Sequence, residues 1–222
     1  MEESYFHILN RGIEKNKIFF CKNDYRRFIL GLYRFNEKNG AIRMPRNKYF
    51  FVGLQKQEEK LVEILKWTLM PNHYHLFVKE KIPGGAVEFA KRIGNGYTKY
   101  INIKNNRSGY LFQNAAKIIR VEENAHFLYL PVYIDLNIVD LVEHKWKEDG
   151  IKNKIKVKDF LKNYKWSSYS DTIGIKNFPE IINLELFYDI FDTDANKYKE
   201  EVEEWINNGL KQDWSTWQVD QS

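Results

Sequence analysis

Residues 63–79 read EILKWTLMPNHYHLFVK, and this stretch decides the fold. Two runs rich in aliphatic and aromatic residues flank Pro71-Asn72, a dipeptide typical of turns. We therefore expect an antiparallel β-hairpin, with one strand on each side of the turn. Side chains alternate between the two faces of a strand, so His73 and His75 are expected on one face and Tyr74 on the other.

The segments on both sides of this hairpin alternate between strand-like and helix-like patterns. Further strand candidates cover 5–10, 49–55 and 116–121. Segments with apolar residues at helical spacing cover 25–33, 85–102, 124–142 and 196–208. This mixture of helices with antiparallel strands predicts an α+β fold.

The composition excludes several classes of protein. The chain has 222 residues and a mean hydropathy of −0.59, and it has no apolar run long enough to span a membrane. The first residues lack the basic and apolar regions of a signal peptide. One cysteine, Cys21, excludes an internal disulfide and a cysteine-rich zinc site. We expect a cytoplasmic protein that contacts no membrane.

The charge of the chain is unevenly distributed. The net charge is +5, yet residues 84–120 contain seven lysines and arginines and a single acid, whereas the segment from Asp192 onward contains eight acids and three lysines. Tyrosines lie among the basic residues, and such a segment suits a phosphate backbone whose bases stack on aromatic rings. The alternative is a solvated, lysine-rich helix face.

Two pairs of residues have the spacing of a catalytic site. His73 and His75 could chelate one cation, although two half-exposed strand histidines would give the same pattern. Tyr133 and Asn137 are four apart and share a face if their segment is helical. A phenol can form a phosphoester, and an amide oxygen suits Mg²⁺ or Mn²⁺, but Tyr133 could equally be a packing residue. Pro131 is expected to break or kink this helix.

Taken together, these segments resemble a known family. The stretches that carry the resemblance, in the family's order, are 5–12, 69–76, 97–102 with 107–113, 133–137 and 164–169. They are similar to the blocks of HUH-type single-tyrosine transposases, and particularly to those of the REP-associated tyrosine transposases. The stretch 69–76 resembles the family's metal-site strand, and 133–137 resembles the helix that carries its nucleophile.

The resemblance implies a fold, an activity and a site. The fold would be a ferredoxin-like antiparallel sheet with helices on one face, in a catalytic domain over 1–142, followed by a lysine-rich connection and a helical C-terminal extension over 143–222. The activity would be metal-dependent cleavage and rejoining of single-stranded DNA beside a hairpin, through a covalent 5′-phosphotyrosine. The nucleophile would be Tyr133, and His73, His75 and Asn137 would hold Mg²⁺ or Mn²⁺.

The resemblance also implies the partners. Single-stranded DNA with a hairpin is the expected substrate, and the resemblance admits a homodimer. The candidate DNA contacts are all basic: Arg11, Lys91, Arg92, Lys99, Arg107, Lys117 and Arg120.

Two other functions remain open from the sequence. The first is a domesticated nucleic-acid-binding protein without catalysis. It is favoured by Pro131 and by Ile138, which stands where the family has proline. The second is a metal-dependent hydrolase, in which the histidine pair and Asp135 would activate water and no DNA adduct would form.

Overall fold

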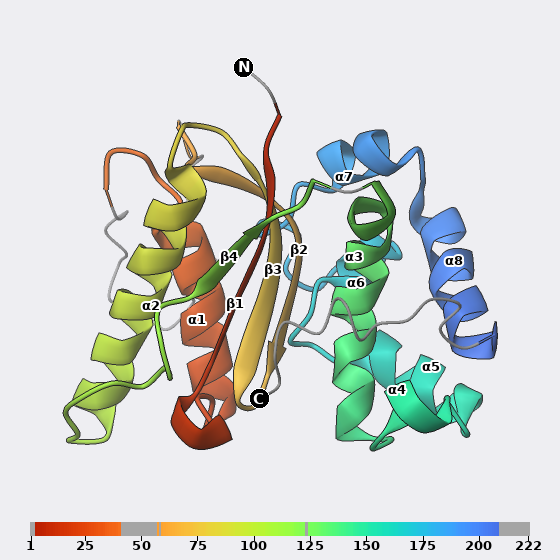
Figure 1. The fold of residues 1–222 in the computed structure, drawn as a ribbon, viewed down its shortest axis with the longest axis horizontal. Coiled ribbons are helices and arrows are strands. Elements are labelled where there is room, and N and C mark those ends of the chain that lie inside the picture. The colour runs from red at the N-terminus through yellow and green to blue at the C-terminus, as the bar shows by residue number, and fades with distance from the viewer. Residues whose placement is uncertain (1–2, 41–56, 58, 123, 209–222) are drawn as a thin grey trace.

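A four-stranded antiparallel sheet organises the chain (Figure 1). The computed structural model describes residues 3–40, 57, 59–122 and 124–208. The strands follow the order β2-β3-β1-β4 across the sheet, and they cover β1 (Tyr5–Arg11), β2 (Val62–Met70), β3 (His73–Glu80) and β4 (Lys117–Arg120). The strand expected over 49–55 lies outside the described residues.

Two helices complete the βαββαβ order of a ferredoxin-like fold. Helix α1 (Lys22–Arg34) connects β1 to β2, and helix α2 (Gly85–Lys104) connects β3 to β4. Both helices lie on the same face of the sheet (Figure 1). This arrangement confirms the predicted α+β class, with a helical C-terminal part after the sheet.

The central hairpin forms as predicted, with one irregularity. Met70 pairs with His73 across the two-residue turn, and a β-bulge interrupts the register between Ile64 and Lys66. The bulge changes which side chains share a face. Ile64 packs with Trp67 in the core beneath α1 and α2, whereas Leu65 packs in the core on the opposite face.

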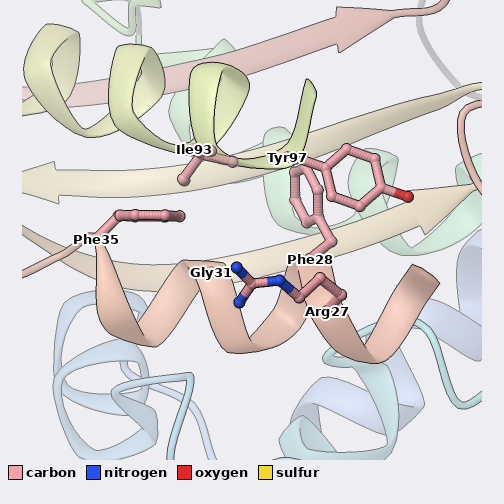
Figure 2. Close-up of a pocket in the computed structure, with 7 residues that line it drawn as sticks. Arg27, Phe28, Gly31, Phe35, Ile93 and Tyr97 are labelled. Atoms are coloured by element: carbon pink, nitrogen blue, oxygen red, sulfur yellow. The ribbon is translucent and has the colours of Figure 1, made fainter. Parts of the chain in front are cut away.

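Close contact between α1 and α2 depends on small residues. Gly96 lies against Phe35, and a Cβ atom added at Gly96 would stand 2.4 Å from the Cζ atom of that ring. Figure 2 shows this crossing, where Arg27, Phe35 and Ile93 line a small pocket between the two helices. Glycine at this position therefore lets the helices approach closely enough to share one core.

The face that carries the histidines is also covered by helices, whereas we expected the helices of the sheet domain on one face only. Helix α3 (Asn124–Leu136) packs on β2 and β3 and continues into a 3₁₀ segment, η2 (Asn137–Leu141). The C-terminal helices lie beyond α3 (Figure 1): α4 (Trp146–Asp149), α5 (Lys154–Asn163), α6 (Tyr169–Thr172), α7 (Leu184–Phe191) and α8 (Ala195–Asn208).

The composition of α3 explains why it is enclosed. Val132 and Ile134 point to opposite sides of the helix, and both are fully buried. A helix segment that is apolar on opposite sides must be covered on both, here by the sheet and by the C-terminal helices. Pro131 lies inside α3 and does not end it, so of the expected break or kink the break does not occur.

A buried ion pair ties α3 to the sheet and to α8. The Nζ atom of Lys66 lies 2.6 Å from Oδ2 of Asp135 and 2.8 Å from the Thr172 hydroxyl. The Tyr198 hydroxyl donates a hydrogen bond of 2.7 Å to the same Asp135 oxygen. Burial lowers the pKa of Lys66 and raises the pKa of Asp135, and the charge of each partner opposes that effect.

The second hydrophobic core contains residues from both sides of residue 142. Phe77 of the sheet, Ile134 of α3, Phe187 of α7 and Val202 of α8 belong to the same buried cluster. The division into 1–142 and 143–222 remains a prediction. Within the described ranges, no helix combines the length and apolarity needed to cross a membrane.

Candidate active site

Three histidines from two strands form the floor of the candidate site. In the β1–β3 register Leu9 lies opposite His75 and Arg11 lies opposite His73, so these side chains share one face of the sheet. His7 belongs to the same face, and its Nε2 atom lies 2.9 Å from Nδ1 of His75. The ring centroids of His73 and His75 are 5.1 Å apart. The histidine pair on one face is therefore as predicted.

These histidines are neutral at physiological pH. Burial lowers the pKa of His7 to about 3, and burial together with the nearby charges of Lys147 and Arg11 lowers the pKa of His73 to about 4. The pKa of His75 is also held well below its ordinary value, first by burial. A neutral imidazole keeps one nitrogen lone pair, which is the form that binds a metal ion.

The hydrogen bond of His73 decides which nitrogen keeps that lone pair. Its Nδ1 atom lies 2.7 Å from Oδ1 of Asn72, an oxygen that can only accept, so Nδ1 of His73 carries the proton. The Nε2 atom then has the lone pair. In the pair formed by His7 and His75, one imidazole donates and the other accepts, which orients the His75 ring.

Tyr133 of α3 lies over the histidines. Its ring centroid is 5.8 Å from that of His75 and 6.2 Å from that of His7, with both rings nearly perpendicular to it. Only 8% of Tyr133 is exposed, and this burial raises its pKa, while the neighbouring Asn137 side chain acts in the opposite direction. Tyr133 is therefore an un-ionised phenol at neutral pH.

The fold brings together all four residues of the two predicted pairs. Asn137 is the first residue of η2 rather than part of α3, yet it faces the Tyr133 phenol, as the four-residue spacing predicts. Its side chain is 2% exposed. The described residues contain no group of three or more His, Cys, Asp or Glu side chains placed to hold a metal ion, so a cation here would need the Asn137 amide as a ligand.

Asp135 does not lie where the hydrolase hypothesis requires it. Its carboxylate is fully buried and bonded to Lys66 and Tyr198 in the second core. A carboxylate that already holds a buried ammonium and a phenol is not available to activate water beside the histidines. The structure therefore disfavours Asp135 as a catalytic base.

The predicted DNA contacts divide between the two faces of the sheet. Arg11 and Lys117 lie on the histidine face, since they pair in register with His73 and Leu9. Lys91, Arg92 and Lys99 lie on α2, which covers the other face. Arg92 also bonds to Glu88 at 2.7 Å and to the Glu37 carbonyl at 2.6 Å.

The two remaining candidates also lie away from the histidines. Arg107 follows α2 and donates a hydrogen bond of 2.8 Å to the carbonyl of Tyr110. Arg120 pairs with Phe6, which places it on the α2 side of β4, and its Nε atom is 3.6 Å from Glu122. The fold thus places two of the seven candidates, Arg11 and Lys117, on the face that carries the histidines.

Two residues of the site were missed by the sequence reasoning. His7 had a usable signal, because alternation along β1 puts it on the same face as Arg11. Lys147 had none: it lies 14 positions beyond Tyr133, and only the packing of α4 brings its Nζ atom to 5.1 Å from the centroid of the Tyr133 ring.

Comparisons with known proteins found a likeness among solved structures. No protein-family model matches the chain, and no curated protein sequence matches it. Among solved structures, the chain is similar to a REP-associated tyrosine transposase bound to a REP hairpin. The identity is 14% and the TM-score 0.47, over 80% of this chain and 82% of that chain.

Proposed function

We propose that this chain cleaves and rejoins single-stranded DNA beside a hairpin, with Tyr133 as the nucleophile. In this proposal His73, His75 and Asn137 hold a divalent cation, Mg²⁺ or Mn²⁺. The observation that supports the proposal is that two residue pairs about 60 positions apart in the sequence lie next to each other in the fold. The ring centroids of Tyr133 and His75 are 5.8 Å apart. The sequence resemblance supports the same assignment independently of this geometry.

The reaction is a phosphoryl transfer that conserves the number of phosphoester bonds. The Tyr133 oxygen forms a bond to phosphorus, and the bond between phosphorus and the 3′-oxygen breaks. The phenolic proton ends on the departing 3′-oxygen, which leaves a 5′-phosphotyrosine and a free 3′-hydroxyl. Attack by a second 3′-hydroxyl reverses the step and rejoins two strands, so no nucleotide cofactor is needed.

The donor set fits a hard divalent cation, provided that a negative charge is also present at the site. Two neutral imidazoles and an amide oxygen carry no negative charge, and the ammonium and guanidinium groups of Lys147 and Arg11 act on the same site. A bound cation would polarise the phosphate and orient it for attack. Because the site is positive without DNA, the phosphate must supply the charge that makes cation binding favourable.

This condition gives a measurable prediction. In the non-cleaving Tyr133→Phe protein, Mn²⁺ should bind at least tenfold more tightly when single-stranded hairpin DNA is present, which corresponds to about 1.4 kcal/mol of coupling. Isothermal titration with and without DNA measures it. Equal Mn²⁺ affinities in the two titrations would contradict the assignment of the cation to this site.

The proposal is tested by formation of a covalent adduct. The protein is incubated with single-stranded hairpin oligonucleotides and Mn²⁺, and the products are separated on a denaturing gel. We expect a protein–DNA adduct from the parent protein and none from Tyr133→Phe, which removes only the reacting hydroxyl. Tyr129→Phe is the matched control, because Tyr129 is one helical turn earlier and equally buried. It should retain the adduct.

The other outcomes separate the competing functions. Cleavage without an adduct, retained in Tyr133→Phe, would indicate a hydrolase. Tight binding of hairpin DNA with no cleavage in any variant would indicate a domesticated binding protein, for which the deep burial of Tyr133 would be a sufficient reason. Loss of the adduct in Tyr129→Phe alone would move the nucleophile to that residue.

A further inference from the structure

Lys147 is held at the candidate site by the packing of its neighbour. Trp146 is 2% exposed and belongs to the second hydrophobic core, and the left-handed backbone of Lys145 (φ 60°) turns the chain into α4. This anchoring directs the next side chain toward Tyr133. The Nζ atom of Lys147 lies 5.1 Å from the centroid of the Tyr133 ring.

Two buried hydrogen-bond donors flank Tyr133 without an acceptor. The Nζ atom of Lys147 and the Nδ2 atom of Asn137 are both inaccessible to solvent, and neither makes a hydrogen bond of good geometry with a described residue, although the Asn137 side chain is close enough to the Tyr133 phenol to lower its pKa. A buried polar group costs several kcal/mol when its hydrogen bonds are missing, and a buried ammonium costs more than a neutral donor. Two such donors beside the Tyr133 phenol indicate that a hydrogen-bond acceptor binds there.

The charges around this position indicate that the acceptor is an anion. The ammonium of Lys147 acts on His73 and His75, and Arg11 acts on His73. Asp140 attracts Lys147 through space, but no carboxylate in the described part of the chain forms an ion pair with it. The site therefore combines cationic and neutral donors, and Asp140 acts on Lys147 only through space.

We propose that Lys147 and Asn137 bind the non-bridging oxygens of the scissile phosphate and that Lys147 is a further catalytic residue of this chain. The inference rests on the proposed function, since it names the group that receives the reacting phosphate beside Tyr133. The Asn137 amide can serve both roles, because its oxygen can face a cation while its nitrogen donates to the phosphate.

The chemical role of Lys147 is electrostatic. As the Tyr133 oxygen approaches phosphorus and the 3′-oxygen departs, negative charge is redistributed over the phosphoryl oxygens. An ammonium already fixed at that place stabilises this charge without reorganisation, and in a buried site its effect is larger than in water. Burial lowers the pKa of Lys147, and the negative charge of a bound phosphate would favour its protonated form. Lys147 transfers no proton in this role, and the phenolic proton still ends on the 3′-oxygen.

The test compares Lys147→Met with Lys156→Met. Methionine keeps most of the stem and removes the charge. Lys156 is an exposed lysine on α5 and serves as the control. In single-turnover adduct formation with Mn²⁺, Lys147→Met should be about 10²–10³-fold slower, as for loss of one preorganised donor. Its hairpin affinity should stay within about threefold, because other phosphate contacts supply most of the binding.

A second measurement does not depend on activity. Inorganic phosphate is titrated at pH 7 into the parent protein and both variants, and the ¹H–¹⁵N spectrum is followed. We expect saturable shifts in the parent protein and in Lys156→Met, centred on the backbone amides around 133–137 and 146–148. Lys147→Met should lose these shifts.

The outcomes keep the two proposals apart. If no variant forms an adduct but phosphate shifts are lost in Lys147→Met, the proposed function fails and the anion site stands. If the parent protein forms an adduct and Lys147→Met forms it within threefold of the parent rate, the role of Lys147 is overturned and the proposed function stands. Phosphate shifts that survive in Lys147→Met would also overturn it.

Discussion

The two faces of the sheet differ in what they bury. On the face beneath α1 and α2, the strands contribute Ile8, Leu76 and Val78 to a core made mostly of aliphatic and aromatic side chains. On the face beneath α3, the same strands contribute His7 and His75, and β2 contributes Lys66, all of them buried. The first face therefore stabilises the fold by packing. The second face encloses titratable groups, whose desolvation costs free energy.

This difference indicates which face of the sheet is the candidate for a functional site. Buried imidazoles, an ammonium and a carboxylate require desolvation, which an apolar core would avoid. Lys66 and Asp135 form an ion pair with each other, through one carboxylate oxygen. The histidines, Asn137 and Lys147 instead lie around a single phenol, that of Tyr133. The first pair serves the structure, and the second group is the candidate for chemistry.

The largest expected effect on stability comes from the buried pair. Asp135→Ala leaves the Lys66 ammonium without its partner and should lower the free energy of unfolding by about 3–5 kcal/mol. Urea denaturation measures this. The double variant Lys66→Met/Asp135→Leu should recover most of the loss, because both charges are then removed. A loss below 1 kcal/mol in Asp135→Ala would show that the pair does not hold α3 to the sheet.

On the face beneath α1 and α2, the stability of the protein should depend on side-chain volume rather than on charge. Gly96→Ala places a Cβ atom against Phe35 and should cost about 1–3 kcal/mol by overpacking. Gly94→Ala meets nothing within 4 Å and should gain up to about 1 kcal/mol from helix propensity. The two variants should therefore differ by about 1–4 kcal/mol in thermal or urea unfolding. Equal stabilities would contradict the close crossing of α1 and α2.

The histidine face should also make the protein sensitive to acid. The pKa of His7 is about 3 in the folded state, against an ordinary value of 6.5 that applies to the unfolded chain. Between pH 6.5 and 3 the unfolded state therefore binds a proton that the folded state refuses, so stability falls as the pH falls. The loss attributable to one imidazole is at most about 1.4 kcal/mol per pH unit.

The comparison that isolates this effect is His7→Asn. Its free energy of unfolding should decline less steeply than that of the parent protein between pH 6 and 4, whatever its stability at pH 7. Urea titrations at several pH values give both slopes. Identical slopes would mean that His7 takes up its proton in the folded state near its ordinary pKa.

Much of the fold could be predicted because its signals are local. The turn at Pro71-Asn72 and the alternation around it fixed the hairpin, and the stripes of α1 and α2 followed from apolar spacing. The covering of the histidine face could not be predicted, because it depends on tertiary packing of α3. Lys66 illustrates the limit: alternation suggests a strand residue on a polar face, whereas Asp135 and Thr172 allow its burial.

Site residues that are related by short spacing along the chain could be predicted. Site residues that are brought in by strand register or by tertiary packing could not. The pair His73 with His75 follows from the geometry of one strand, and the pair Tyr133 with Asn137 from helical spacing that continues from α3 into η2. Their meeting depends on how α3 crosses the sheet, which no local pattern encodes. His7 required the register between β1 and β3, and Lys147 required the anchoring of Trp146 in the second core.

The most direct test of the central claim is to identify the residue that becomes linked to DNA. The parent protein is incubated with a hairpin oligonucleotide and Mn²⁺, digested with protease and nuclease, and analysed by mass spectrometry. We predict a nucleotide adduct on the peptide that contains Tyr133, at the phenolic oxygen of that residue. An adduct confined to a peptide lacking Tyr133, such as one containing Tyr110, would contradict the assignment of this site.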